Sequence, residues 1–146
     1  MTYPYLFSTI RINNLELANR IVLTAMHLGY TPEGEVTDQL LDFYELRAKG
    51  GVGLIIVGGC PIDEYGGMNS MIRIDHDRFI PGLKKLTSTV KAHGPKIAAQ
   101  LYQAGRYSHS SMIGGKTPVS SSPVRSRLTG ETPRALELDE IPLMQD

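Results

Sequence analysis

The sequence has few of the features that mark a disulfide-stabilised, metal-binding or membrane protein. It contains one cysteine, Cys60. A single thiol cannot form an internal disulfide, and no cluster of cysteine and histidine has metal-ligand spacing. No apolar run reaches the ~18 residues that a membrane helix needs, and no signal peptide follows the N-terminus. We therefore expect no metal site and no membrane partner, and a reducing, cytoplasmic setting.

An excess of charge of either sign is also missing. The 146 residues carry 15 basic and 15 acidic side chains, for a formal net charge of zero. Without a global positive field, nucleic acid is not an expected partner. An apolar fraction of 41% with 21% charged residues is typical of one ordinary globular domain.

Hydrophobic periodicity predicts alternating strands and helices after a short hairpin. The predicted elements are a hairpin over 6–17 with its turn at 13–14, a strand over 21–24, a helix over 38–49, a strand over 53–57 that stops at Gly58-Gly59, a helix over about 78–93 and a strand over 97–101. The strands are near-continuous apolar runs, which favours burial on both faces of a parallel sheet. This order predicts an α/β fold with right-handed crossovers.

The two helices have recognisable ends and apolar faces. Thr37 and Asp77 are the expected N-caps, and Gly50-Gly51 and Gly94-Pro95 are the expected stops. The expected buried faces are Leu40, Leu41, Tyr44 and Ala48 on the first helix, and Ile80, Leu83, Leu86 and Val90 on the second.

The last third of the chain breaks the pattern. Residues 104–135 are rich in Ser, Gly, Pro and Arg without periodicity, and so long a loop is usually functional or disordered. Residues 138–142 look like a helix start, with Asp139 as its cap and an early proline. Three strands and two helices leave the sheet edges open and one face bare, so more chain is expected.

Polar and glycine residues follow each predicted strand. The first strand leads into Ala25-Met26-His27, the second into Gly58-Gly59, and the third carries Gln100 in the run up to Arg106. In parallel α/β proteins ligands lie beyond the carboxyl ends of the strands. Glycine allows a flat ligand to approach the backbone, and a glutamine amide both donates and accepts hydrogen bonds. These residues together favour a site for a planar cofactor.

At these motifs the chain resembles the old yellow enzyme-like NADH:flavin oxidoreductases, most closely the 2,4-dienoyl-CoA reductase and 2-enoate reductase branch. The shared features are residues 19–22, 26–27, 58–59, 79–83 and 96–106, in that order and spacing. The resemblance covers essentially the whole chain. It implies that residues 1–146 are the N-terminal portion of a (β/α)8 TIM barrel that binds FMN, comprising the β-hairpin, three parallel strands and the start of the third helix.

The resemblance also implies roles for individual residues. Ala25, Met26 and His27 would line the flavin from the first strand, and Gly59, with Gly58 as the alternate, would lie against it. Gln100 would hydrogen-bond the pyrimidine part of the ring and so tune the cofactor. His27 as a rim histidine bound by backbone groups, the glycines as a tight strand end, and Gln100 satisfying a buried backbone group are the structural alternatives.

Several other side chains have structural defaults. Cys60 is expected to behave as a small buried hydrophobe, and Arg106 to bind an anion or pin the loop. His109 in the long loop is a candidate for facing substrate. His76 and His93 are expected to be solvated or capping, Lys84 and Lys85 to be solvated, and Arg125, Arg127 and Arg134 form a basic group that could contact the anionic tail of an acyl-CoA.

The implied activity is FMN-dependent reduction of an activated C=C bond, of enoate or dienoyl-CoA type, by NAD(P)H. The resemblance places the catalytic acid, the flavin phosphate site, and in this branch a 4Fe-4S cluster and a second, FAD-binding domain, in later chain, so no catalytic residue is assigned here. This segment alone is expected to be inactive. The alternatives are an FMN-dependent amine dehydrogenase of the same family and an inactive truncated fragment. A small nucleotide-binding domain is not favoured, because no Gly-x-Gly-x-x-Gly motif follows the first strand.

Overall fold

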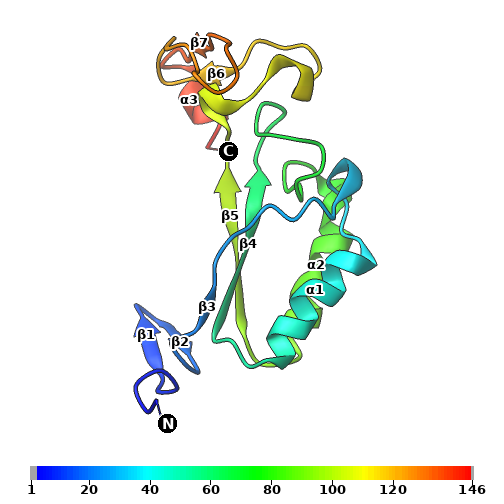
Figure 1. Ribbon diagram of the computed structural model, residues 1–146, viewed down its shortest axis with the longest axis vertical. Coiled ribbons are helices and arrows are strands. Elements are labelled where there is room, and N and C mark those ends of the chain that lie inside the picture. The colour runs from blue at the N-terminus through cyan, green and yellow to red at the C-terminus, as the bar shows by residue number, and fades with distance from the viewer. Residues whose placement is uncertain (1–2, 146) are drawn as a thin grey trace.

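The computed structural model describes residues 3–145, which form a three-stranded parallel sheet with two helices packed on one face (Figure 1). The strands are β1 Ile10–Ile12, β2 Leu15–Leu17, β3 Val22–Leu23, β4 Leu54–Pro61, β5 Lys96–Tyr102, β6 Val119–Ser120 and β7 Arg134–Ala135; the α-helices are α1 Asp38–Lys49, α2 Ile80–Lys91 and α3 Glu140–Leu143. The sheet order is β3-β4-β5, so consecutive strands are neighbours. The predicted hairpin is confirmed as β1-β2, and the predicted β/α alternation is confirmed in β3 to β5.

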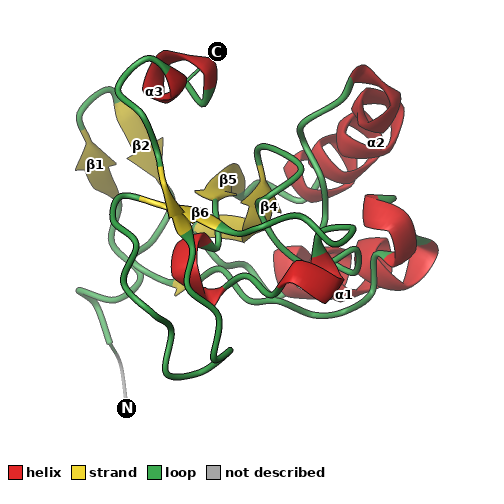
Figure 2. Cartoon of the chain, turned by 90° about the horizontal axis from the view of Figure 1, so that it is seen from above, coloured by secondary structure: helices red, strands yellow, loops and turns green. Residues whose placement is uncertain are grey.

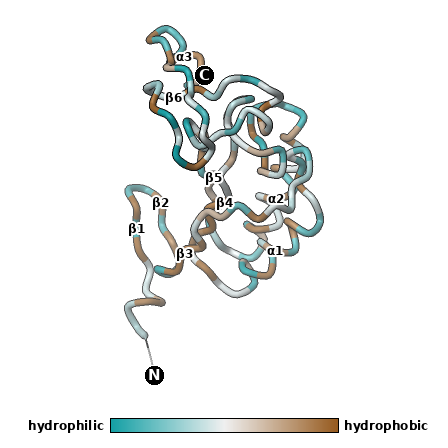
Figure 3. Tube along the Cα trace, turned by 45° about the horizontal axis from the view of Figure 1, so that its top comes forward, coloured by the Kyte–Doolittle hydropathy of each residue, from teal (hydrophilic) through white to brown (hydrophobic). Residues whose placement is uncertain are grey.

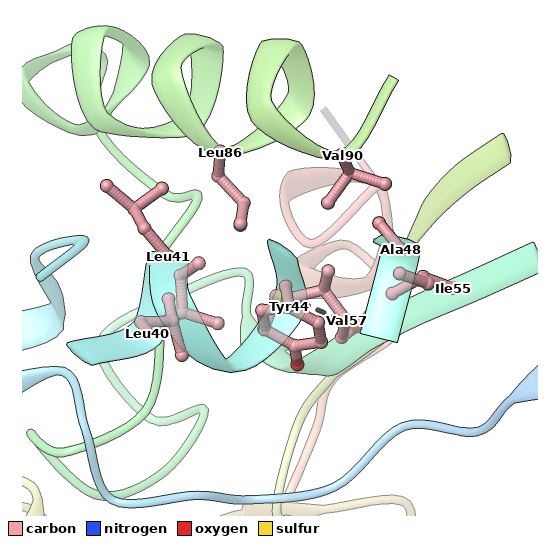
Figure 4. Packing of buried hydrophobic residues seen from close by; sticks show 10 residues of the cluster. Leu40, Leu41, Tyr44, Ala48, Ile55, Val57, Leu86 and Val90 are labelled. Carbon is pink, nitrogen blue, oxygen red and sulfur yellow. Dashed lines mark hydrogen bonds between the residues drawn. The ribbon is translucent and has the colours of Figure 1, made fainter. Parts of the chain in front are cut away.

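Helix α1 has the predicted limits and the predicted buried face. The Thr37 Oγ1 atom accepts a hydrogen bond of 3.2 Å from the Leu40 N–H, which satisfies one of the free donors of the first turn. Its four predicted apolar residues are between 1% and 7% exposed. They pack against Ile55 and Val57 of β4 and against Leu86 and Val90 of α2 (Figure 4). At about 1.5–3 kcal/mol for each large buried side chain, this cluster is the main stabilising contact of the chain.

Strand β4 runs past its predicted end. The glycine pair was expected to stop the strand, but pairing with β5 continues to Pro61 after a register shift between Val57 and Cys60. The Gly58–Gly59 peptide bond is cis. Glycine weakens a strand without preventing it from pairing, and here close contact with β5 accounts for the two missing side chains.

The start of α2 differs from the prediction. Asp77 is not the cap. The His76 Nδ1 atom accepts a 3.0 Å hydrogen bond from the Arg78 N–H, so His76 caps a short 3₁₀ helix, Asp77–Phe79. This 3₁₀ helix leads directly into α2. On the predicted buried face, Leu86 and Val90 are buried, whereas Ile80 is 41% exposed. Ile80 lies in the first turn of α2 and is outside the buried core cluster.

The inner face of the sheet, opposite α1 and α2, is bare. Both helices lie on the same side of the strands in Figures 1 and 2. The prediction of burial on both faces therefore holds only for β4, whereas Val22 in β3 is 40% exposed and most of β5 is exposed. No helix among residues 3–145 covers this face.

The long region after β5 is ordered without being regular. Short 3₁₀ helices at Gly105–Tyr107 and Ser110–Met112 are followed by the parallel pair β6-β7, and Figure 3 shows this region to be largely hydrophilic. The predicted helix start is confirmed as α3, although the Asp139 side chain makes no capping bond. Instead, the Glu140 carboxylate accepts a 2.7 Å hydrogen bond from the Glu137 N–H.

Candidate functional site

Strands β4 and β5 end side by side at one rim, the upper end of the sheet in Figure 1, whereas β3 ends lower, opposite Ile55, and the chain after it continues along β4. Met26, just after β3, forms an isolated antiparallel bridge with Gly58. A Cβ atom placed on Gly58 would lie 2.8 Å from the Gln100 Cβ and 3.3 Å from the Gln100 backbone carbonyl oxygen. Met26, Gly58 and Gln100 are therefore direct neighbours, as the pattern of strand ends predicts.

Gly59 faces a different side chain. A Cβ atom there would lie 2.6 Å from the Tyr102 Cγ and 2.7 Å from the Tyr102 Cβ. Packing against β5 is thus sufficient to explain glycine at both positions. The predicted flavin contact of Gly59, or of its alternate Gly58, stays a prediction.

Gln100 points away from the helices. Ile97 packs against the hydrophobic core, and because side chains alternate along a strand, Ala98 and Gln100 project from the opposite face. Gln100 is exposed, and its amide makes no hydrogen bond to another residue in the described range 3–145. The Gln100 amide thus has a free hydrogen-bond donor and a free acceptor, and its neighbour Gly58 has no side chain.

His27 and Ala25 flank this group. The His27 Nε2 atom lies 3.3 Å from the Ser70 carbonyl oxygen and 3.2 Å from the Ser70 Oγ, and the Thr31 hydroxyl donates to the same carbonyl at 2.6 Å. His27 is thus an exposed rim histidine joined to the loop after β4, as in the structural alternative for it. Ala25 is half-buried next to Met26. The cavity between residues 26–31, the glycine pair and residues 70–72 has a volume of only about 10 Å³, so these three segments are closely packed.

Two buried groups support the rim from the outer side, and sequence patterning did not select them as part of the site. Burial raises the pKa of Tyr44 to about 12, although a hydrogen bond with the Gly58 backbone acts in the opposite direction. Burial likewise raises the pKa of Cys60 to about 11. Both groups are neutral at physiological pH, and Cys60 behaves as the small buried hydrophobe that was expected.

The other candidate side chains of the long loop are engaged locally. Both Arg134 Nη atoms donate to the Glu140 carboxylate, at 2.6 and 2.7 Å, and Arg125 Nε donates to the Gly130 carbonyl at 2.8 Å. His109 lies 3.4 Å from Glu131, and the Arg106 guanidinium stacks at 5.4 Å from the Tyr107 ring. Anion binding by Arg106 and by the group of Arg125, Arg127 and Arg134 stays a prediction, as does a substrate-facing role for His109.

The expected structural roles of the remaining histidines and of Cys60 are supported by geometry. His76 is a cap, and the His93 Nε2 atom lies 3.1 Å from a Glu45 carboxylate oxygen. Among residues 3–145, no group of His, Cys, Asp or Glu is arranged to hold a metal ion. Within the same residues, none of the helices combines the length and the apolar character needed to cross a membrane.

Comparison with known families gives one match that spans nearly the whole chain. The model described as the NADH:flavin oxidoreductase / NADH oxidase family matches residues 5–141. The chain is 58% identical over 136 residues to a metal reductase of Desulforamulus reducens, covering 93% of this chain and 20% of the relative. It is 39% identical to an NADH oxidase of Thermoanaerobacter brockii, over 95% of this chain and 22% of that protein. The chain therefore spans about a fifth of the length of these relatives.

Solved structures also match over nearly the whole of this chain. Morphinone reductase bound to tetrahydroNAD superimposes with a TM-score of 0.88 at 28% identity, over 97% of this chain and 43% of that one. A 2-naphthoyl-CoA reductase complex gives a TM-score of 0.88 at 27% identity, over 97% of this chain and 24% of that one. The predicted fold is thereby confirmed: the hairpin and the three parallel strands are the N-terminal portion of a (β/α)8 barrel.

Proposed function

The chain belongs to the NADH:flavin oxidoreductase / NADH oxidase family, and from this premise we propose that it is the first part of an FMN-dependent enzyme that reduces activated C=C bonds with NAD(P)H. The observation that carries the proposal is the exposed Gln100 amide beside Gly58 at the carboxyl rim. We propose further that residues 1–146 are part of one FMN-binding barrel domain.

The chemistry of the donor set fits a flavin ring. Gln100 offers an unpaired amide N–H and an unpaired amide oxygen, which match the alternating carbonyl and N–H groups of a pyrimidine edge. Met26 beside it is 41% exposed, so its apolar surface is available for contact with a ring. Ala25, His27 and Gly59 complete the proposed wall.

Bound FMN would supply hydride transfer from its N5 atom to the β-carbon of the alkene. Within this chain the residues bind and orient. The Gln100 N–H would donate to a pyrimidine oxygen, which favours the negative charge that the ring gains on reduction. Met26 would exclude water from one edge. No residue of this chain is assigned the proton transfer to the α-carbon, which would fall to a side chain on a later strand.

Names among the relatives support alkene reduction. The chain is 40% identical to an NADH:fumarate oxidoreductase of Klebsiella pneumoniae and 36% identical to an NADH:acrylate oxidoreductase of Vibrio harveyi. Fumarate and acrylate are both carboxylates conjugated to a double bond. We therefore propose an alkene conjugated to a carboxylate or acyl-CoA thioester as the small-molecule substrate. Because this chain matches only 20% of its 58%-identical relative, there is room in later chain for the 4Fe-4S cluster and FAD domain of the proposed branch.

Two alternative functions are each favoured by one relative. The chain is 36% identical over 97% of its length to an N,N-dimethylglycine/sarcosine dehydrogenase, which favours amine oxidation. The 58% identity to a metal reductase favours a metal ion as electron acceptor. All three candidates need the same flavin wall and differ in the electron donor or acceptor.

Stopped-flow absorbance of the complete enzyme, with FMN bound, separates these functions. We expect NADH or NADPH to bleach the flavin, and crotonate or crotonyl-CoA to restore its absorbance with formation of the saturated product. Bleaching by dimethylglycine would instead support the amine dehydrogenase. Reoxidation by ferric citrate, with no reoxidation by either alkene, would support the metal reductase and contradict alkene reduction.

A further inference from the structure

A second pocket lies at the same rim and is lined by Tyr102, which also packs against Gly59. It is a cavity of about 470 Å³ between the loop after β4 and the loop after β5, and it is mainly apolar. Its walls include Met68, Met71, Tyr102, Ser108, Met112 and Leu128. We propose that this pocket binds the apolar tail of the substrate, and that Ser108 hydrogen-bonds an oxygen atom on that tail. This inference rests on the proposed flavin function of the rim.

Ser108 is the observation that points to a ligand. The residue is 3% exposed, and its Oγ atom is buried without a hydrogen-bond partner among residues 3–145. A buried hydroxyl without a partner costs about 1–3 kcal/mol, so such groups usually have a function. Here the residue lines the cavity. Rotation of the Ser108 hydroxyl toward the cavity would let an oxygen atom of a ligand satisfy it.

The pocket is already shaped by hydrogen bonds within its walls. The Ala104 N–H donates to the Gly66 carbonyl at 3.1 Å, which joins the two loops at their base. The Glu131 carboxylate accepts from the N–H and the hydroxyl of Ser110, at 2.9 and 2.6 Å. These bonds hold the 108–112 segment against the turn that carries Leu128. A preformed, mainly apolar cavity with one or two placed polar groups is the usual form of a small-molecule site.

Position and lining determine which part of a substrate would occupy the pocket. Tyr102 packs on Gly59 and also lines the cavity, so the pocket adjoins the proposed flavin wall without including Gln100 or Met26. Three methionines give it deformable walls that accept carbon skeletons of different shape. The reacting double bond would lie at the flavin, with the carbon chain beyond it in the pocket. An apolar tail with one distal hydroxyl or carbonyl fits this lining.

The test compares three substrates in the complete, FMN-loaded enzyme. But-3-en-2-one has no tail, dec-3-en-2-one has an apolar tail, and 10-hydroxydec-3-en-2-one adds a distal hydroxyl. We expect Ser108→Ala to raise KM for the hydroxylated substrate about fivefold, the effect of about 1 kcal/mol for one neutral hydrogen bond. KM for the other two should change less than about twofold, because neither bonds the hydroxyl.

A second variant tests the space rather than the bond. Met112 is 45% exposed and Met112→Trp adds bulk to the pocket wall, so both long substrates should lose affinity while but-3-en-2-one does not. Ser122→Ala, at an exposed serine of the same loop outside the pocket, is the control and should change none of the three. Equal effects of Ser108→Ala on all three substrates would overturn the proposal, as would long substrates that are insensitive to Met112→Trp.

Calorimetric binding of butan-2-one, decan-2-one and 10-hydroxydecan-2-one separates this inference from the proposed function. If no enone is reduced but the long ketones bind with the predicted response to both variants, the pocket is supported and alkene reduction is contradicted. If but-3-en-2-one is reduced while the long ketones bind no better than butan-2-one, alkene reduction stands and the inference is overturned.

Discussion

The outer and inner faces of the β3-β4-β5 sheet differ in what their side chains do. On the outer face Ile55 and Val57 are 0% and 4% exposed beneath α1 and α2, and burial raises the pKa of the neighbouring Tyr44 and Cys60, which keeps both neutral. On the inner face Gln100 is exposed, and its amide has no partner in the described chain. The comparison places the stabilising contacts on the outer face and the proposed ligand contacts on the inner face. Substitutions on the two faces should therefore have opposite signatures.

The largest effect on stability is expected from the outer face. Leu86→Ala removes a side chain that is 1% exposed between α1 and α2, and it should lower the free energy of unfolding by about 2–5 kcal/mol. Leu46→Ala, at a leucine of α1 that is 68% exposed, is the matched control and should cost less than about 1 kcal/mol. Chemical denaturation followed by circular dichroism measures both. Equal costs would remove the distinction between the faces.

A substitution where the two faces meet should affect both properties. Gly58→Ala places a methyl group 2.8 Å from Gln100 at a φ of 156°, and we expect a loss of about 2 kcal/mol together with weaker FMN binding. Gly114→Ala is the control, because its φ of 69° is also unfavourable for alanine but nothing lies within 4 Å. If the two variants are equally destabilised, backbone conformation alone explains the glycine. If FMN binding is unchanged in Gly58→Ala, the proposed contact there is wrong.

The loop that borders the rim should show a pH-dependent contribution. The Arg73 side chain donates to both oxygens of the Asp75 carboxylate, and this hydrogen bonding holds the pKa of Asp75 below its usual value. A depressed pKa means that the stabilisation is present above the ordinary Asp pKa of about 4 and is lost as the pH falls through the folded pKa. Asp75→Asn should therefore cost about 1.5 kcal/mol at pH 7 and little in strong acid.

The control for this prediction is Asp38, an exposed residue whose carboxylate lies 3.0 Å from the Lys85 Nζ. Asp38→Asn should change stability by less than about 1 kcal/mol at any pH, as is usual for exposed ion pairs. Unfolding measured between pH 2 and pH 7 compares the two variants. A constant difference between wild type and Asp75→Asn over this range would show that the carboxylate contributes nothing as a charge.

Local signals predicted most of the outer face. The Thr37 cap and the apolar spacing of α1 are properties of adjacent residues, so the limits of that helix follow from the sequence. The stop at Gly58-Gly59 was wrong because the contact with Gln100 and Tyr102, which replaces the missing side chains, joins residues more than 40 positions apart. The His76 cap replaced Asp77 for a similar reason, because both side chains can accept a hydrogen bond and only the folded backbone selects one.

The candidate site was partly predictable in the same sense. The rule that ligands lie at carboxyl strand ends, together with sheet order, brought Met26, Gly58 and Gln100 together. Tyr44 was expected only as a core residue, because its approach to the Gly58 backbone depends on how α1 packs on β4. The pocket around Ser108 was indicated only by the length of its loop and by His109, which also lines it. It depends on hydrogen bonds between turns within a loop that lacks periodicity.

The most direct test of the central claim is the flavin affinity and reduction potential of Gln100→Ala in the complete enzyme. We predict FMN binding about fivefold weaker and a more negative potential, because the lost hydrogen bond stabilises the reduced ring, with stability unchanged within about 0.5 kcal/mol. Gln39→Ala on the exposed surface of α1 is the control and should change neither property. Unchanged affinity and potential in Gln100→Ala would contradict the assignment of the inner face as the flavin wall.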